Sequence, residues 1–382
     1  MSRLYSDLVK IALFSLGTTF LLWLPFLLHL PNFWGINLPA GGFEIILRNF
    51  DGLNYTIVAK SLYNPSIIAG FPQINLPPIY FASHFPGYPL LINLFSPALG
   101  YLYGMVAITL AFAIASAWAF YLMVKKLNLS NAPLWLSLVF LILPARFLIA
   151  RSVPAPETIF IFLVIVAIYF FIRGLQTGHQ QDFWITGISG ALAQTTRSPG
   201  ILLFVALGLY CLYEFAVNRK LLWKAFPLFL IPLTLLAIFF WYDKAYGDVL
   251  AYFHSGDNIH LTLPPFSVFN TQQFWVGTIW LEDLVWLYLI YIIAAIRLFK
   301  KKLYPMAFFV TVFLAASMMV AHRDIARYSL PIAPFAIIAF EDIIQRKEFK
   351  IGLVLVALAI YLFSLNFISY NVFPFYNLTP YR

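Results

Sequence analysis

The stretch ETIFIFLVIVAIYFFIRGL at residues 157–175 begins with one acidic residue, has one basic residue near its end and is almost entirely apolar between them. A helix needs about 20 mainly apolar residues to cross roughly 30 Å of hydrocarbon, so this stretch predicts a transmembrane helix. Similar stretches recur along the chain. The predicted spans are residues 11–30, 101–124, 133–150, 157–175, 183–197, 199–217, 225–242, 284–299, 304–321, 329–344 and 351–370. The sequence therefore predicts an all-α polytopic membrane protein with about eleven transmembrane helices.

The composition of the whole chain supports a membrane protein. Hydrophobic residues make up 62% of the 382 residues and charged residues only 10%, whereas about a quarter of a soluble domain is charged. We expect one membrane-embedded domain over residues 1–382, because no segment between spans suits a soluble domain. The stretch 11–30 is longer than a signal-peptide core and is expected to stay as an anchor. The single Cys211 excludes an intramolecular disulfide and a multi-thiolate metal site.

The distribution of charge predicts the orientation. With a cytoplasmic N-terminus, the internal loops hold 15 of the 24 basic residues and 6 of the 15 acidic ones, which leaves 9 of each for the external side. An excess of Lys and Arg marks cytoplasmic loops, so we expect the N-terminus inside and the C-terminus outside. The net charge of +9 is thereby explained without a nucleic-acid partner. The internal basic residues are Arg3, Lys10, Lys125, Lys126, Arg173, Arg219, Lys220, Lys224, Arg297, Lys300, Lys301, Lys302, Arg346, Lys347 and Lys350.

Two long segments then lie outside the membrane, at about residues 31–100 and 243–283. The first is rich in Pro, Gly and aromatic residues, and its apolar pieces at 67–71 and 90–99 are too short to span. Such pieces suit helices that lie in the membrane interface. Long loops in a compact protein are usually functional. We therefore expect the functional site on the external side.

Ionisable side chains gather at the external ends of the predicted spans. Because charged groups near membrane depth are costly, each is a candidate functional residue. The cytoplasmic side has no comparable set. The external set comprises Asp51, His84, Arg146, Arg151, Glu157, Arg197, Asp243, Asp248, His254, His322, Arg323, Asp324 and Arg327. We expect many of them to converge on one site.

Asp51 precedes a short predicted helix that carries Tyr55 and Val58 on one face. Its alternative role is to cap that helix, since Asp is a favoured N-cap residue. Arg197 and Arg327 occur at external helix ends, and Arg can hold a phosphate through two hydrogen bonds at once. The alternative partners of these arginines are lipid headgroups and, for Arg327, a neighbouring aspartate.

Glu157 begins a predicted span after Pro154 and Pro156. The helix dipole alone would stabilise a glutamate in this first turn. The sequence has no glycine loop that would cradle nucleotide phosphates, no zinc-type His spacing and no nucleophile elbow. We therefore assign no metal ligand and no cofactor, and leave a requirement for a divalent metal open.

Five short motifs resemble those of one family in their order along the chain. NFDGLNYTIVA at 49–59 resembles the Trp-Asp-Gly-x-x-Tyr-x-x-Ile-Ala opening of the GPI-mannosyltransferase-like (PIG-V-type) branch of the GT-C superfamily of polytopic glycosyltransferases. HFPGYP at 84–89 is similar to its Phe-Phe-Pro-x-Tyr-Pro element. PETIF at 156–160 and TRSPGI at 196–201 are similar to its Ser-Glu-x-x-Phe and Thr-Arg-x-x-Gly segments, and Arg327-Tyr328 resembles the late Arg-Tyr…Pro pattern. Phe50 and His84 stand where the family usually has Trp and Phe.

The resemblance implies an inverting transfer of a single sugar, a mannose-like hexose, from a polyprenyl-phosphate donor. By likeness, Asp51 would be the general base for a hydroxyl acceptor on a glycan, glycolipid or protein. Arg197 and Arg327 would bind the donor phosphate, which leaves as an anion and needs positive groups. The remaining candidate substrate-binding residues are Tyr55, His84, Tyr88, Glu157 and His322.

The alternative function is a transporter or flippase for lipid-linked sugars. Transporters commonly show internal repeats and broken helices at the membrane midplane. This sequence has no convincing repeat, and its polar residues gather at the external rim, which favours the transferase. A non-catalytic scaffold does not explain so many charges near one face. With no retention signal of eukaryotic type, a prokaryotic plasma membrane is favoured over the endoplasmic reticulum.

Overall fold

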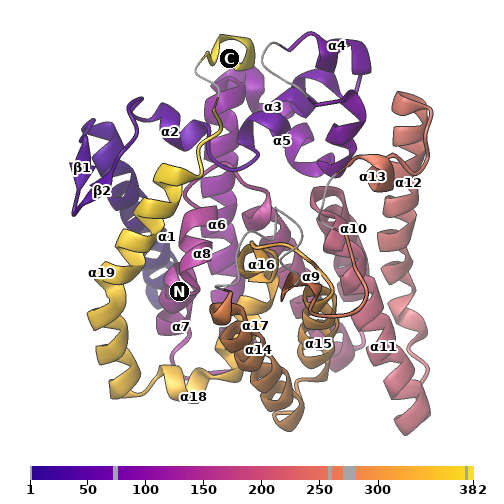
Figure 1. Cartoon of the computed structure of the whole chain (residues 1–382). Coiled ribbons are helices and arrows are strands. Elements are labelled where there is room, and N and C mark those ends of the chain that lie inside the picture. Colours follow the sequence, from indigo (N-terminus) through magenta and orange to yellow (C-terminus); the bar gives the residue numbers. More distant parts are fainter. Residues whose placement is uncertain (1, 72–75, 257–259, 270–280, 375–376) are drawn as a thin grey trace. The chain divides into compact units, whose positions relative to one another are not determined.

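The computed structural model describes residues 2–71, 76–256, 260–269, 281–374 and 377–382 (Figure 1). Parts of the two predicted external segments, at 72–75, 257–259 and 270–280, lie outside the described residues. The chain divides into two compact units. Unit 1 contains Met1–Phe162 and Glu341–Arg382, and unit 2 contains Leu163–Phe340. The prediction of a single domain over residues 1–382 stays a prediction.

Unit 1 holds the N-terminal helices, the first external segment and the C-terminal helix. Its elements are α1 (Ser2–Leu27), β1 (Asn32–Phe33), β2 (Ile36–Asn37), α2 (Glu44–Leu47), α3 (Gly52–Ser61), α4 (Pro65–Ala69), the 3₁₀-helix η1 (Pro78–Ser83), α5 (Gly87–Leu99), α6 (Tyr101–Lys126), α7 (Pro133–Ile142), α8 (Ala145–Ala150), the start of α9 (Glu157–Thr177), α18 (Glu341–Ile344), α19 (Lys347–Tyr370) and η6 (Thr379–Tyr381).

Unit 2 holds the central part of the chain. Its elements are the rest of α9, α10 (Gln180–Thr196), η2 (Ser198–Gly200), α11 (Ile201–Asn218), η3 (Trp223–Phe229), α12 (Leu230–Tyr246), α13 (Ala251–His254), η4 (Ser267–Phe269), α14 (Glu282–Lys300), α15 (Tyr304–Met318), α16 (Ile325–Tyr328), η5 (Leu330–Ile332) and α17 (Ala333–Ala339).

Helices occur at each predicted span, which confirms a helical polytopic membrane protein. Within the described residues, six helical stretches are long and apolar enough to cross a membrane, and three further apolar helices are shorter. The six stretches are Leu4–Leu27, Tyr101–Lys126, Glu157–Thr177, Ser198–Asn218, Trp223–Tyr246 and Lys347–Tyr370. The count of eleven spans stays a prediction.

Two predicted spans are interrupted by residues that lie outside any helix. The span 133–150 consists of α7 and α8, which are separated at Leu143 and Pro144, and the span 329–344 is divided among η5, α17 and α18. A proline inside a helix removes one backbone hydrogen bond and clashes with the preceding turn. Pro144, Pro331 and Pro334 all lie at or near these interruptions. The expectation of continuous helices over these two ranges was therefore wrong.

The first external segment folds mainly into short helices, as its short apolar pieces predicted. The pieces at 67–71 and 90–99 fall largely in α4 and α5. One β-hairpin is added to the helical fold, with Asn32 opposite Asn37 and Phe33 opposite Ile36. The two residues between the strands have positive φ angles of 54° and 80°, as the tight hairpin turn requires.

At one end of unit 1, side chains connect α1, α6, α7 and α18. Tyr121 of α6 donates a hydrogen bond of 2.7 Å to Asp7 of α1, and Lys125 donates to the Tyr121 hydroxyl over 3.0 Å. Trp135 of α7 donates to the carbonyl of Ile344 over 2.9 Å. Most of the predicted internal basic residues of this unit lie near these helix ends. This grouping is expected when successive helices alternate in direction.

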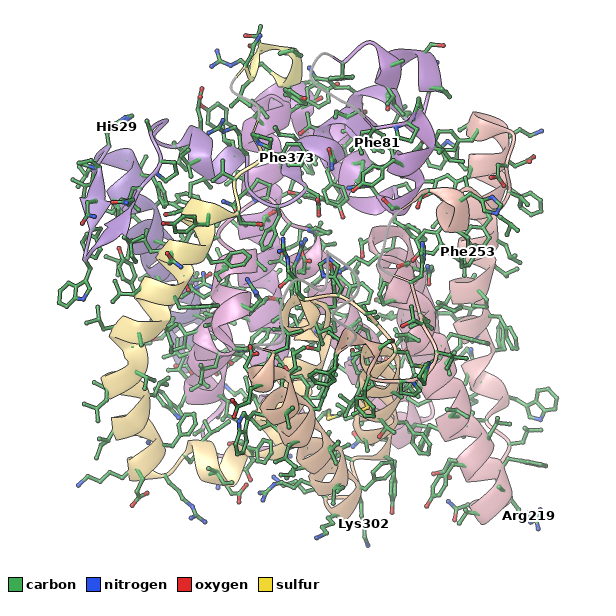
Figure 2. The ribbon with its side chains drawn as sticks, in the orientation of Figure 1. His29, Phe81, Arg219, Phe253, Lys302 and Phe373 are labelled. Atoms are coloured by element: carbon green, nitrogen blue, oxygen red, sulfur yellow. The ribbon has the colours of Figure 1, made fainter. Side chains whose placement is uncertain are left out.

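The helices of unit 2 also alternate in direction. Lys224 donates to the carbonyl of Gly178 over 2.7 Å, so the α9–α10 and α11–α12 connections lie together. Figure 2 shows Arg219 and Lys302 at one end of this unit and Phe253 far from that end. The connections rich in Lys and Arg are therefore separated from the predicted external segment.

Candidate active site

Asp51 occupies the N-cap position of α3, but its side chain makes no capping hydrogen bond to that helix. An N-cap aspartate normally accepts a hydrogen bond from one of the first backbone N–H groups of its helix. The alternative role considered for Asp51, that of a simple helix cap, is therefore not supported. The Asp51 side chain is half-buried.

The residues before Asp51 are fastened to the end of α19. The Asn49 side chain donates a 2.7 Å hydrogen bond to the carbonyl of Ile368, and the backbone N–H of Phe373 donates to the carbonyl of Arg48 over 2.8 Å. Figure 2 labels Phe373 in the segment that leaves α19. Phe50 has a φ of +48° and belongs to a buried apolar cluster formed by α1, α2, α8 and α19. These contacts fix the backbone at Asp51.

Gly52 sets the distance between α3 and the segment that leads into α9. A Cβ at Gly52 would lie 2.8 Å from Cβ of Pro154, which is closer than two such atoms can approach. Only glycine allows this contact without a shift of the backbone. The glycine of the quoted motif thus holds the Asp51 turn against Pro154, three residues before Glu157.

An aromatic cluster follows Asp51 in unit 1. The Tyr55 ring of α3 contacts the His84 ring at 4.9 Å between centroids and the Tyr88 ring at 5.1 Å, both edge to face. Nδ1 of His84 lies 3.0 Å from the Ser83 hydroxyl, and the Tyr63 hydroxyl donates to the His84 carbonyl over 2.6 Å. Unit 1 therefore brings together three of the predicted substrate-binding residues.

The Tyr88 hydroxyl makes hydrogen bonds to residues of the neighbouring helix α6. The hydroxyl donates to the carbonyl of Met105 over 2.7 Å and lies 3.0 Å from the Thr109 hydroxyl, which contacts the backbone of Ala155. The side chain is fully buried. Burial, and then the nearby Tyr55 and Glu157, raise the pKa of Tyr88. This geometry favours a structural role for Tyr88 over the predicted contact with substrate.

Glu157 lies in the first turn of α9 and is fully buried. Its charge is close enough to raise the pKa of Tyr88. A helix N-terminus stabilises a glutamate there, and a side chain without exposed surface cannot reach an acceptor directly. The position therefore favours a supporting role beside the aromatic cluster.

The other predicted residues gather in unit 2 around Tyr328. The guanidinium carbon of Arg197 lies 5.8 Å from the centroid of the Tyr328 ring, and the His322 ring lies 5.3 Å from it. Nδ1 of His322 accepts a 3.0 Å hydrogen bond from the backbone N–H of Asp324. Arg327 precedes Tyr328 and is only 6% exposed. Arg197, His322 and Arg327 thus lie in one neighbourhood of unit 2.

A tight reversal places Arg197 between α10 and α11. Arg197 has extended backbone angles, and residues Ser198–Gly200 form the 3₁₀-helix η2. A Cβ at Gly200 would lie 2.5 Å from Cα of Gln194, so a larger residue does not fit there. The hydroxyl of Tyr252 donates to the Ser198 hydroxyl over 3.0 Å, which connects the second external segment to this turn.

Asp248 and His254 pair with each other rather than joining the cluster around Tyr328. Oδ2 of Asp248 lies 2.7 Å from Nδ1 of His254 at the surface of unit 2. The hydrogen bond from His254 lowers the pKa of Asp248. A surface pair of this kind contributes little to stability, and it is local to one loop.

Arg151, which the sequence places in the external set, lies inside unit 1. Its guanidinium is fully buried and donates to the hydroxyls of Thr18 and Thr19 in α1 over 2.6 and 2.7 Å. It also donates to the carbonyls of Ser15 and Leu141 over 3.0 and 2.9 Å. These neutral acceptors replace water around a buried charge, so Arg151 fastens α8 to α1 and α7.

Two basic residues of the first predicted external segment were missing from the predicted set. Arg48, three residues before Asp51, is 5% exposed. Lys60 of α3 donates to the carbonyl of Pro380 over 2.8 Å, and burial lowers the pKa of Lys60. Figure 1 shows the C-terminal segment beside α3. Such contacts to backbone carbonyls leave no signal in the sequence.

Among the described residues, no three His, Cys, Asp or Glu side chains are grouped so that they could hold a metal ion. The sequence predicted no metal ligand. The predicted site residues carry carboxylate, imidazole, phenol and guanidinium groups.

No protein-family model and no curated protein sequence matches the chain. Among solved structures, it is similar to ArnT from Cupriavidus metallidurans bound to undecaprenyl phosphate, with a TM-score of 0.59, 12% identity and coverage of 90% of this chain and 63% of that chain. It is also similar to the Archaeoglobus fulgidus oligosaccharyltransferase tethered with an acceptor peptide, with a TM-score of 0.52, 15% identity and coverage of 98% and 56%.

These likenesses show that the chain shares the fold of these two proteins, as its resemblance to the GT-C superfamily predicted. The chain spans less than two thirds of the length of both proteins. Their sequences are too different to assign a branch of the superfamily, so the PIG-V-type branch stays a prediction.

Proposed function

We propose that this protein is an inverting membrane glycosyltransferase that moves one sugar from a polyprenyl-phosphate donor to a hydroxyl acceptor. The observation that carries the proposal is the Asp51 carboxylate, which lies at the start of α3 without capping it. The GT-C fold adds support, because one neighbour holds undecaprenyl phosphate and another holds an acceptor peptide.

In this mechanism Asp51 is the general base. It accepts the proton of the acceptor hydroxyl as the hydroxyl oxygen attacks the anomeric carbon of the sugar. The bond from that carbon to the carrier phosphate breaks on the opposite side, so the configuration is inverted. Since Asn49, Phe50 and Gly52 are held by backbone and packing contacts, the carboxylate needs little reorganisation before it reacts.

Arg197 and Arg327 are proposed to bind the phosphate of the donor. The leaving phosphate gains negative charge as the bond breaks, and a guanidinium can stabilise it with two parallel hydrogen bonds. Both arginines flank Tyr328, with Arg197 over its ring.

Tyr55, His84 and His322 are proposed to contact the sugar or the acceptor. Tyr55 lies in α3, four residues after Asp51, and forms an edge-to-face pair with His84. Aromatic side chains with a polar tip suit a partly apolar sugar face. His84 can accept or donate a hydrogen bond that a phenylalanine at this position could not make. A mannose-like hexose is the expected sugar.

We expect the site to face the external side of a prokaryotic plasma membrane, with the N-terminus in the cytoplasm. Basic residues concentrate in the loops on the other side of the predicted spans, as the positive-inside rule requires for cytoplasmic loops. A lipid-linked donor reaches such a site through the membrane, so no nucleotide-binding domain is needed.

The deciding experiment incubates the purified full chain with a panel of polyprenyl-phosphate sugars, including polyprenyl-phosphate mannose, and with glycan, glycolipid and peptide acceptors. Transfer of one sugar with inverted configuration, lost in Asp51→Asn, is the expected result. If the chain instead moves the labelled lipid-linked sugar across a vesicle membrane and transfers nothing, it is a transporter and the proposal is wrong.

A further inference from the structure

The connection between α11 and α12 carries basic and aromatic side chains on its surface. Its three basic residues, Arg219, Lys220 and Lys224, are all exposed. Two aromatic residues of the 3₁₀-helix η3 lie among them, and the side chains of Trp223 and Phe226 are 76% and 51% exposed. Figure 2 shows Arg219 at one end of unit 2. These five residues are called the basic–aromatic patch below.

Packing against α10 holds the backbone of η3 in place. Pro227 is buried, and a Cβ at Gly187 of α10 would clash with the carbonyl oxygen of Pro227, so the two elements are in direct contact. The ring of Phe226 lies edge to face with the ring of Trp184, with 5.2 Å between the centroids. The aromatic side chains of the patch therefore project from a backbone that the fold itself supports.

Two carboxylates on the neighbouring helices have partners outside the patch. Glu214 accepts hydrogen bonds of 2.9 Å from both Tyr210 and Asn218. Asp182 is buried and forms a 2.9 Å ion pair with Arg173. Within the described part of the chain, neither carboxylate pairs with a basic residue of the patch. The patch therefore keeps its positive charge.

Two basic residues near the α14–α15 connection provide a contrast. Arg297 and Lys301 donate hydrogen bonds to backbone carbonyls at the end of α17, over 2.8 and 3.3 Å. These two side chains fasten one helix to another. In the described ranges, the side chains of Arg219 and Lys220 make no such bond. Their charges are therefore not used by the fold.

We infer that the basic–aromatic patch binds the headgroups of anionic phospholipids in the surrounding bilayer. The guanidinium of Arg219 matches two oxygens of a phosphate, and the ammonium of Lys220 adds a second positive charge. Trp rings favour the headgroup level of a membrane, where one end is apolar and the other is wet. Exposed aromatic rings beside these charges favour a lipid over a soluble anion. This inference is independent of the proposed function.

The test uses the full chain in nanodiscs of phosphatidylcholine mixed with phosphatidylglycerol. Lipids that stay on the protein after release into detergent are counted by native mass spectrometry. The wild-type chain should retain phosphatidylglycerol in preference to phosphatidylcholine. Arg219→Gln and Lys220→Gln should each weaken the retention of phosphatidylglycerol roughly fivefold and leave that of phosphatidylcholine unchanged. High salt should reduce the preference, since it screens exposed charges.

Lys302→Gln is the matched control. Lys302 is also exposed, has a φ of +58° where Arg219 has +52°, and lies at the same end of unit 2 (Figure 2). This variant should keep the preference for phosphatidylglycerol. An equal loss in Lys302→Gln and Arg219→Gln would show a general attraction of positive charge instead of a headgroup site. Equal retention of the two lipids by the wild-type chain would also overturn the inference.

Discussion

Gly52 and Pro154 touch so closely that a methyl group added to the glycine would lie 2.8 Å from Cβ of the proline. The contact joins the first turn of α3 to the segment that leads into α9. Asp51 lies on one side of it and Glu157 follows on the other. The position of the candidate base therefore depends on a residue whose own side chain does no chemistry.

Gly52→Ala should reduce transfer strongly while the protein still inserts. The added methyl group forces α3 and Asp51 to shift, and overpacking of this kind costs about 1–3 kcal/mol. Transfer rate and thermal unfolding would be measured on the same preparation. Gly208→Ala is the control, because a Cβ at Gly208 meets nothing within 4 Å. Full transfer in Gly52→Ala would show that the position of Asp51 does not depend on this contact.

Asp51→Asn should leave the protein folded and inserted but lower the transfer rate by about 10²–10⁴, the usual contribution of a general base. The side chain makes no capping hydrogen bond to α3, so the loss of a helix cap, about 1 kcal/mol, should not appear in the unfolding temperature. Asp248→Asn alters a carboxylate paired only within its own loop and should be active. A fully active Asp51→Asn variant would remove Asp51 from the chemistry.

Arg327→Ala should raise the KM for the donor more than the KM for the acceptor. A lost charge-assisted hydrogen bond to phosphate costs about 1.5–3 kcal/mol, which is roughly a 10- to 100-fold change. Arg323→Ala, two positions before the helix α16 and exposed, is the control. If the dependence on donor concentration is unchanged in Arg327→Ala, this residue does not hold the phosphate.

The sequence predicted the elements of the site better than their contacts. The turn at Asp51, the aromatic residues of the first external segment and the arginines at external helix ends were found by local motifs, and the structure groups them within each unit. The roles of Tyr88 and Arg151 were not foreseen, because their partners Met105, Thr18 and Thr19 lie in spans that appear uniformly apolar.

The sequence also predicted some helix boundaries incorrectly. The apolar run 133–150 is long enough for one span, yet Pro144 divides it. The short α8 that results contains Arg146 and ends before Arg151, and the two side chains have different surroundings. Hydropathy averaged over a window cannot detect this division.

Thr19→Val tests the buried position of Arg151. The substitution keeps the shape of the side chain but removes the hydroxyl that accepts a 2.7 Å hydrogen bond from the guanidinium. A buried donor left unsatisfied costs about 1–3 kcal/mol, so the unfolding temperature should fall while the transfer rate per folded molecule is unchanged. Thr311→Val removes a hydroxyl that bonds only to its own helix and should cost less. Equal stability of the two variants would contradict the anchoring of α8 to α1 through Arg151.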